Sequence, residues 1–215
     1  MKDSHRVTVV SACAPELRAV EAACASITDG GCTLTFALVG IGLVDAALGM
    51  RLVLDSMEER PDCVVLVGTC GAYAGSTLRV GDVCVPSRVC VASGDAAESR
   101  AALLGAEVFD LDAGVSRALG GPGGLVATTL GITTDDALAC SIERATGATV
   151  EHLEAWSVAK VCRGAGLTTA VVLGVANAVG ARGREEWRTH RGEAERAAAV
   201  RVADWLSRGA PGLRG

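Results

Sequence analysis

Short apolar runs alternate with amphipathic segments along most of the chain. Near the amino end, strands are expected at 6–13 (RVTVVSAC) and at 32–40 (CTLTFALVG), where apolar residues dominate or alternate with polar ones. Helical patterns follow them, at 15–25 with apolar residues every three or four positions, and at 44–59. The second helix is expected to end before Pro61, because the residue preceding a proline avoids the helical conformation. The chain therefore begins with two strand–helix units.

The same alternation continues toward the carboxyl end. The run CVVLVG at 63–68 is apolar on both faces, which predicts a central strand covered by helices on both sides. A glycine-rich loop is expected at 68–82 and a strand-like stretch at 83–92. Residues 94–124 are rich in glycine and charge and are interpreted as a variable excursion containing a loop and one short helix. Further strands are predicted at 125–132, 149–152 and 168–177, and further helices at 135–145, 153–163 and 183–206.

Strands that alternate with helices predict an α/β fold. We expect a single domain spanning 1–215, with a central mixed but largely parallel β-sheet flanked by helices, because 215 residues suit one domain better than two. In such a sheet, ligands bind at the carboxyl ends of the strands. Functional residues are therefore expected at those ends.

Composition narrows the class of protein. Aromatic residues make up only 3% of the chain while half of it is apolar, so the core is expected to consist of small, closely packed side chains. The net charge of −5 and the lack of a basic cluster with interleaved aromatics argue against nucleic-acid binding. No membrane span and no signal peptide are recognised, which predicts a cytoplasmic protein.

Metal and redox chemistry have little support in the sequence. The nine cysteines are odd in number, form no CxxC pair and mostly lie in apolar runs, where a reduced cysteine is a small hydrophobic residue. A zinc site or a redox pair remains the alternative. The three histidines lack metal-ligand spacing and GxSxG is absent, so neither a metal nor a cofactor is expected.

Three strand ends are rich in glycine, at 39–42, 67–73 and 174–180. Glycine lets a ligand approach the backbone and exposes amide N–H donors. Each segment alone is consistent with an ordinary turn, but the three together predict a ligand site. The absence of GxGxxG and of a Walker lysine argues against dinucleotides and nucleoside triphosphates.

Three polar residues lie beside these strand ends. Glu16 and Glu154 each open a helix, where the helix dipole favours an acid even without a function. Glu154 has mainly apolar neighbours, so a role in binding sugar hydroxyls is the alternative to a simple helix-terminal charge. Asn177 ends the most apolar strand and either forms a turn or contacts a ligand.

Taken in order, three segments resemble the nucleoside phosphorylase and nucleosidase superfamily, which includes methylthioadenosine/S-adenosylhomocysteine nucleosidases and futalosine hydrolases. VGIGLVDAALG at 39–49 resembles its SGIGKVNAA loop and helix, and the segment at 61–87 resembles its PD(x)n-G-(S/T)-x-G-x(n)-GDxV pattern. VEHLEAWSVAKVC at 150–162 resembles its V-E-x-M-E-x-A-x-A helix. The likeness covers most of the chain except 94–124, and it implies the same fold.

The resemblance also implies roles for individual residues. Glu16 matches the acid that activates water, Glu154 the glutamate that holds the ribose hydroxyls, and Leu153 the methionine beneath the sugar. Ile132 falls near the residue lining the purine pocket. Further substrate contacts are expected from Gly42, Thr69, Cys70 and Gly71, with Arg18, His152, Arg182 and Trp187 as additional candidates.

The expected base follows from Asn177, which matches an aspartate of adenine-specific nucleosidases. An amide offers two N–H donors, which suit O6 and N7 of a 6-oxopurine, although the other orientation also pairs with adenine. The tail after it resembles S-N-x-V-G-x-R-(D/N)-x-x-x-W of futalosine hydrolases, with Gly180, Arg182 and Trp187 in matching places. The resemblance therefore implies a futalosine hydrolase of menaquinone biosynthesis that releases hypoxanthine.

Two alternatives remain open at this point. Hexameric phosphorylases carry a phosphate-binding arginine where this chain has Leu66, which favours hydrolysis, but Arg18 matches their second phosphate arginine. Asp45 and Leu153 replace the usual Asn and Met, so a non-catalytic nucleoside-binding protein is the other alternative. The expected partners are a small-molecule nucleoside and a second copy of the chain, in a homodimer or higher homo-oligomer that uses the apolar helix at 44–57.

Overall fold

Sixteen helices and strands follow one another through the described part of the chain. The computed structural model describes residues 4–27, 31–104, 108–121 and 123–213. The elements are β1 His5–Ser11, α1 Ala14–Cys24, β2 Cys32–Leu38, α2 Leu43–Asp55, β3 Cys63–Ala72, β4 Val83–Cys84, β5 Arg88–Ala92, α3 Gly94–Ala97, β6 Phe109–Asp110, α4 Ala113–Ala118, β7 Leu125–Thr129, α5 Asp136–Thr146, β8 Val150–His152, α6 Ala155–Gly164, β9 Thr168–Ala178 and α7 Gly183–Ser207.

One sheet joins all the strands of the described residues. Its order is β2-β1-β3-β8-β7-β5-β6, with β9 paired to both β3 and β4. Neighbouring strands run parallel in β1–β2, β1–β3, β3–β9, β5–β7 and β7–β8. They run antiparallel in β3–β8, β4–β9 and β5–β6. The expected α/β fold with a mixed, largely parallel sheet is confirmed.

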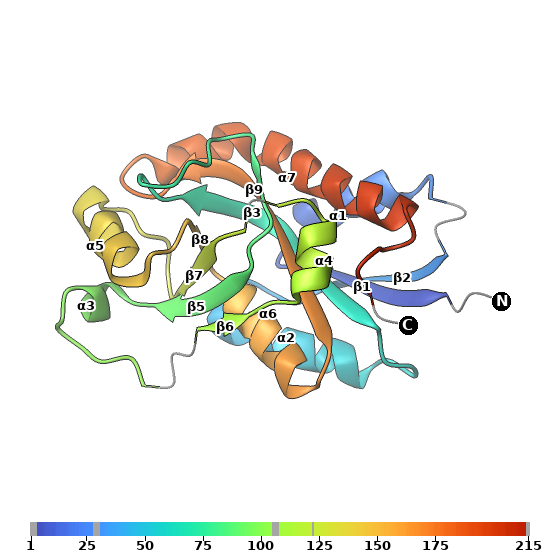
Figure 1. The fold of residues 1–215 in the computed structure, drawn as a ribbon. Coiled ribbons are helices and arrows are strands. Elements are labelled where there is room, and N and C mark those ends of the chain that lie inside the picture. The colour runs from blue at the N-terminus through green and yellow to red at the C-terminus, as the bar shows by residue number, and fades with distance from the viewer. Residues whose placement is uncertain (1–3, 28–30, 105–107, 122, 214–215) are drawn as a thin grey trace.

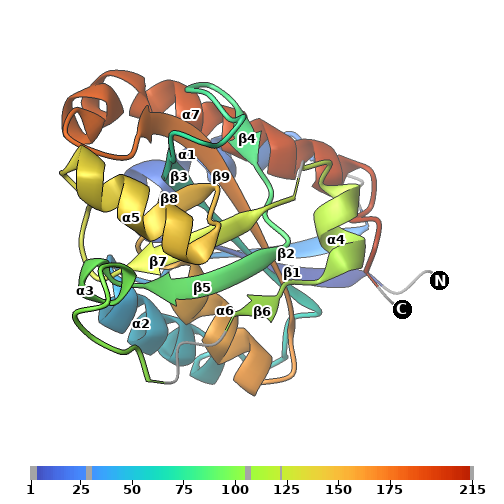
Figure 2. The same ribbon diagram turned by 60° about the vertical axis from the view of Figure 1, so that its left-hand side comes forward.

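Helices cover both faces of the sheet because its central strands are apolar on both faces. Val65 and Val67 of β3 pack in a core with α1 and α7, whereas Val64 and Leu66 pack in a second core with α2 and α6. Figure 1 shows α7 along one face and α2 and α6 on the opposite one, and Figure 2 shows α5 beside β7. None of the helices in the described residues is long and apolar enough to cross a membrane.

Small residues allow α7 to pack closely against β9. A Cβ at Gly174 of β9 would collide with the backbone of Ala194 in α7, so the helix lies directly on the strand only because that side chain is absent. Ala194 and Ala198 on the helix are themselves buried. Because small side chains replace aromatic ones at this contact, the helix and the sheet lie close together.

Two expected boundaries near the middle of the chain are wrong. The strand predicted to end at 68 continues to Ala72, because Gly71 and Ala72 pair with both β8 and β9, and a bulge at Cys70/Gly71 accommodates the change in register. The single strand-like stretch at 83–92 is two strands, β4 and β5, separated by Pro86, which has no N–H for a ladder.

The excursion at 94–124 also has more regular structure than expected. Instead of a loop with one short helix, its described residues form α3, β6 and α4. The carboxylate of Asp112 caps α4 by accepting the N–H of Val115 at 2.8 Å. Residues 105–107 and 122 of this expected excursion lie outside the described residues. After it, β7 ends at Thr129, three residues before the predicted strand end.

Candidate active site

Glu16 lies in the first turn of α1, directly beyond the carboxyl end of β1, and its side chain is 7% exposed. Its Oε1 accepts hydrogen bonds from the backbone N–H of Thr69 at 3.0 Å and from the Thr69 hydroxyl at 3.1 Å. Its Oε2 is buried and has no hydrogen-bond partner among the described residues. One carboxylate oxygen is thus anchored while the other is free to accept a proton.

A second contact fixes the hydroxyl that anchors Glu16. The indole N–H of Trp187 in α7 donates to Thr69 Oγ1 at 3.1 Å, so this hydroxyl accepts from Trp187 and donates to Glu16. The guanidinium of Arg191 lies over the Trp187 ring, 4.9 Å from its centroid. Trp187 is therefore connected to the Glu16 carboxylate through two hydrogen bonds, with the Thr69 hydroxyl between them.

Glu154 occupies the N-cap position of α6 and is 4% exposed. Its Oε1 accepts the backbone N–H of Gly42 at 2.7 Å. Gly42 has φ of 87°, a conformation that favours glycine, and it is the N-cap of α2. The first glycine-rich strand end and Glu154, 112 positions apart in sequence, thus meet in one site.

His152, at the end of β8, lies between the two glutamates and is 5% exposed. Its Nδ1 is 3.2 Å from Glu154 Oε2. On the other side, a Cβ built on Gly68 would lie 3.1 Å from His152 Nε2 and 3.3 Å from Glu16 Oε1. Gly68 therefore leaves the space in which the imidazole and the Glu16 carboxylate approach each other.

Burial dominates the ionisation of all three groups. It raises the pKa of Glu16, which the nearby Glu154 also raises, while His152 and the Thr69 hydrogen bonds oppose the shift. Burial raises the pKa of Glu154 to about 7 against the opposing hydrogen bond from Gly42. It lowers the pKa of His152 to about 4. At neutral pH the site therefore holds a neutral imidazole beside two carboxyl groups whose pKa values both lie above the ordinary value of a glutamate.

Replacing Glu154 with glutamine is expected to stabilise the fold in a pH-dependent way. The pKa of Glu154 rises from 4.5 to about 7 on folding, so its ionised form penalises the folded state increasingly as pH rises through this window. Glutamine removes the charge and keeps an oxygen for the Gly42 N–H. Calorimetry should show a larger gain in Tm at about pH 8.5 than at about pH 5, where the carboxyl group is already largely protonated. An equal gain at both pH values would contradict the shift.

Asn177 lies near the end of β9, opposite Gly71 of β3. Its side chain is partly exposed, and its amide donates one N–H to the carbonyl of Ala178 at 2.8 Å. A Cβ on Gly71 would lie 2.8 Å from Asn177 Nδ2, so this glycine makes room for the amide. The sequence predicts that both N–H groups contact a 6-oxopurine base, whereas in the structure one of them donates to a backbone carbonyl.

Glu151 is an acid that was not among the site residues expected from the sequence. It is buried, and it accepts hydrogen bonds from the N–H and the hydroxyl of Thr133 at 3.0 and 2.5 Å and from the hydroxyl of Tyr73 at 3.1 Å. It thus ties the segment after β7, which carries Ile132, to the end of β3. Ile132 itself is 59% exposed. An acidic residue inside the predicted strand at 149–152 was the available signal.

The other expected site residues divide into two groups. Leu153 is half-buried between His152 and Glu154, and burial raises the pKa of the Cys70 thiol well above its usual range. Arg18 is exposed on α1, and Arg182 is exposed and pairs with Glu186 at 3.2 Å, so the structure does not bring these two arginines to the buried glutamates.

All nine cysteines are free, and no cluster suited to a metal ion occurs among the described residues.

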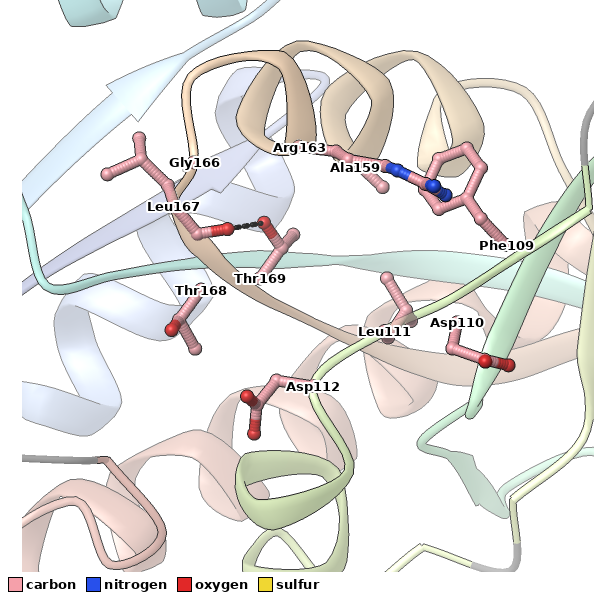
Figure 3. Close-up of a pocket in the computed structure, with 10 residues that line it drawn as sticks. All are labelled: Phe109, Asp110, Leu111, Asp112, Ala159, Arg163, Gly166, Leu167, Thr168 and Thr169. Carbon is pink, nitrogen blue, oxygen red and sulfur yellow. Dashed lines mark hydrogen bonds between the residues drawn. The ribbon is translucent and has the colours of Figure 1, made fainter.

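A cavity of about 340 Å³ lies away from these glutamates, at the opposite end of β9 (Figure 3). Two of its three charged groups already have structural contacts: Asp112 caps α4, and the Arg163 guanidinium lies over Phe109, 5.0 Å from the ring centroid. A second cavity, of about 230 Å³, adjoins the Asn177 end and includes Cys140 and Gly180. The second cavity is therefore the one next to the candidate base-binding end.

A largely parallel sheet with buried acids at its carboxyl edge defines an α/β protein with a candidate site at the strand ends, where small ligands bind in such folds. Residues 13–208 match the family model described as the phosphorylase superfamily, and the chain belongs to this superfamily. The resemblance deduced from the sequence is thereby confirmed at the level of the superfamily. A search of the curated proteins gives no significant match.

Solved structures with the same fold include several nucleosidases. A 5′-methylthioadenosine/S-adenosylhomocysteine nucleosidase from Colwellia psychrerythraea, in complex with adenine, has a TM-score of 0.82 at 18% identity, covering 95% of this chain and 96% of that one. The Neisseria meningitidis enzyme, with methylthio-immucillin-A, has 0.81 at 18%, covering 94% and 98%. An S-adenosylhomocysteine nucleosidase from Streptococcus pyogenes, with 5-methylthiotubericidin, has 0.81 at 20%, covering 96% and 98%.

Proposed function

We propose that this protein is a purine nucleosidase, a hydrolase that breaks the N-glycosidic bond between a purine base and its sugar. The observation that carries the proposal is the Glu16 carboxylate, with Oε1 fixed by Thr69 and Oε2 buried without a partner among the described residues. Such a group is positioned to take a proton from water. The structurally similar nucleosidases, with adenine or nucleoside analogues bound, support the same class of substrate.

In the proposed mechanism the ribose lies over Leu153 with its hydroxyls at Glu154. Water attacks the anomeric carbon while Glu16 takes its proton, and the bond to the base breaks with the electron pair leaving on the base. Glu154 stabilises the oxocarbenium-like sugar through the hydroxyls. Asn177 donates a hydrogen bond to the departing base, which takes its proton from water because an amide supplies none.

The proposed substrate is a 6-oxopurine nucleoside such as futalosine, releasing hypoxanthine. Support comes from Asn177 and from the match of Gly180, Arg182 and Trp187 to the futalosine hydrolase pattern. Binding O6 and N7 with both amide N–H groups requires the bond to the Ala178 carbonyl to be exchanged. The exchange costs little, because one hydrogen bond replaces another.

Water is favoured over phosphate as the nucleophile. Leu66 is buried in the core where phosphorylases carry an arginine, and Arg18 is exposed on α1.

A panel of inosine, futalosine, methylthioadenosine and adenosine, incubated with and without phosphate and followed by chromatography, tests the proposal. Free base and free sugar without phosphate are expected. Ribose 1-phosphate, or strict phosphate dependence, would instead identify a phosphorylase, and binding without release of base would identify a non-catalytic protein.

The assembly is proposed to be a homodimer that buries the outer face of α2. Val44, Leu48 and Leu52 are spaced four residues apart and are 64%, 61% and 68% exposed, so they form one apolar stripe on the helix. Ile41, just before the helix, is 62% exposed and extends the stripe. A contiguous apolar surface of this kind is typical of a contact between protein chains.

Leu48→Glu is expected to shift the protein from dimer to monomer, because two glutamates would face each other across a symmetric contact. Sedimentation velocity measures the change. Val200→Glu, at a site on α7 that is 53% exposed, is the matched control and should leave the sedimentation coefficient unchanged. If Leu48→Glu sediments like the unsubstituted protein, α2 does not form the contact.

A further inference from the structure

His152 is held in a single orientation by the turn that begins α6. The backbone N–H groups of Glu154 and Ala155 both point at its Nδ1, each at 3.1 Å. Glu154 Oε2 also lies 3.2 Å from Nδ1, but the two N–H donors are closer and both require a lone pair on this nitrogen, so the neutral imidazole carries its proton on Nε2. The tautomer is therefore set by the backbone.

The protonated nitrogen faces the Glu16 carboxylate across Gly68. A Cβ on Gly68 would lie 3.1 Å from His152 Nε2 and 3.3 and 3.4 Å from the two carboxylate oxygens of Glu16. Among the described residues, the ionisable groups facing the imidazole are Glu16 from α1 and Glu154 from the start of α6. Glu16 Oε2 is buried and otherwise unpartnered.

We propose that His152 is a positioning residue that presents its Nε2–H to the Glu16 carboxylate, directly or through the attacking water, and so keeps Glu16 ionised and oriented as the base. The inference rests on the proposed nucleosidase function. Its physical basis is that a donor to the charged form of a carboxyl group favours that form. An ionised Glu16 is what proton removal from water requires.

Two substitutions distinguish the effect of the His152 N–H donor from the effect of the size of its side chain. His152→Met fills a similar volume without an N–H donor, whereas His152→Gln places an amide N–H near the position of Nε2. Removing the donor raises the pKa of Glu16, so the acidic limb of the kcat/KM profile should move to higher pH by about one unit in His152→Met. In the same variant kcat should fall by about tenfold or more, with KM nearly constant.

His152→Gln should recover a large part of both the activity and the position of the acidic limb. His5→Gln, at the start of β1, is the matched control with unchanged kinetics. If His152→Met lowers activity without moving the acidic limb, or if His152→Gln is as impaired as His152→Met, the proposed role of the N–H group is wrong.

Long-range ¹H–¹⁵N correlation on the imidazole rings tests the geometry independently of activity. The chain has three histidines, so the signals are assignable by substitution. His152 should show a protonated Nε2 and a bare Nδ1 at neutral pH, and Glu16→Gln should shift its Nε2 signal but not those of His5 and His190. A proton on Nδ1 would overturn the inference. If the panel shows no nucleosidase activity but this signature is present, the proposed function fails and the geometry stands.

Discussion

Glu16→Gln is expected to lower kcat for nucleoside hydrolysis by about 10²- to 10⁴-fold, the usual contribution of a positioned acid–base group. Glutamine keeps the size of the side chain and an oxygen for the Thr69 N–H, but it takes no proton from water. KM for the nucleoside should change little, because the proposed mechanism assigns the sugar to Glu154 and the base to Asn177. Steady-state kinetics on the nucleoside released fastest in the panel measures the effect.

Glu21→Gln provides the matched control for this substitution. Glu21 lies on the same helix and is exposed, so its replacement removes the same charge without touching the site. Its kcat should equal that of the unsubstituted protein. Unchanged kcat in Glu16→Gln would remove Glu16 from the mechanism and the proposed function would lose its supporting observation.

Asn177→Asp is expected to change the preferred base. A protonated aspartate donates at N7 and accepts from an adenine amino group, whereas its acceptor oxygen opposes O6 of a 6-oxopurine. The ratio of kcat/KM for 6-aminopurine over 6-oxopurine nucleosides should rise by about 10²-fold, since a hydrogen-bonding site discriminates strongly against a mismatched group. Paired measurements with inosine and adenosine give this ratio directly.

Asn177→Ala tests whether the side chain of Asn177 determines which base is preferred. It removes both hydrogen-bonding groups, so activity should fall for both bases while their ratio moves toward one. A ratio that is the same in Asn177→Asp and in the unsubstituted protein would show that another group selects the base, and the assignment of a 6-oxopurine would lose its main support.

Much of the fold was predictable, because the spacing of apolar and polar residues along a segment indicates its secondary structure without knowledge of distant segments. The run at 63–68, which is apolar on both faces, predicted a central strand with helices on both sides. In the structure β3 lies between two hydrophobic cores. Glu16 and Glu154 were identified as acids beside strand ends, and the structure buries both, one on either side of His152. Their meeting depends on topology, since parallel strands place their carboxyl ends along one edge.

Other features depend on pairing between distant segments, which no local pattern encodes. The extension of β3 to Ala72 requires β8 and β9 as partners. The role of Glu151 requires Tyr73 and Thr133, 78 and 18 positions away. His152 lacked any metal-like spacing in the sequence, and its position between two acids appears only when β8 is placed next to β3.

The most direct test of the central proposal is the initial rate of hypoxanthine release from futalosine or inosine in phosphate-free buffer, measured for the unsubstituted protein and for Glu16→Gln purified in parallel. Hydrolysis at this site predicts steady release by the former and at least about a hundredfold slower release by the latter. Equal rates from both, release only when phosphate is added, or no release from either nucleoside would contradict it.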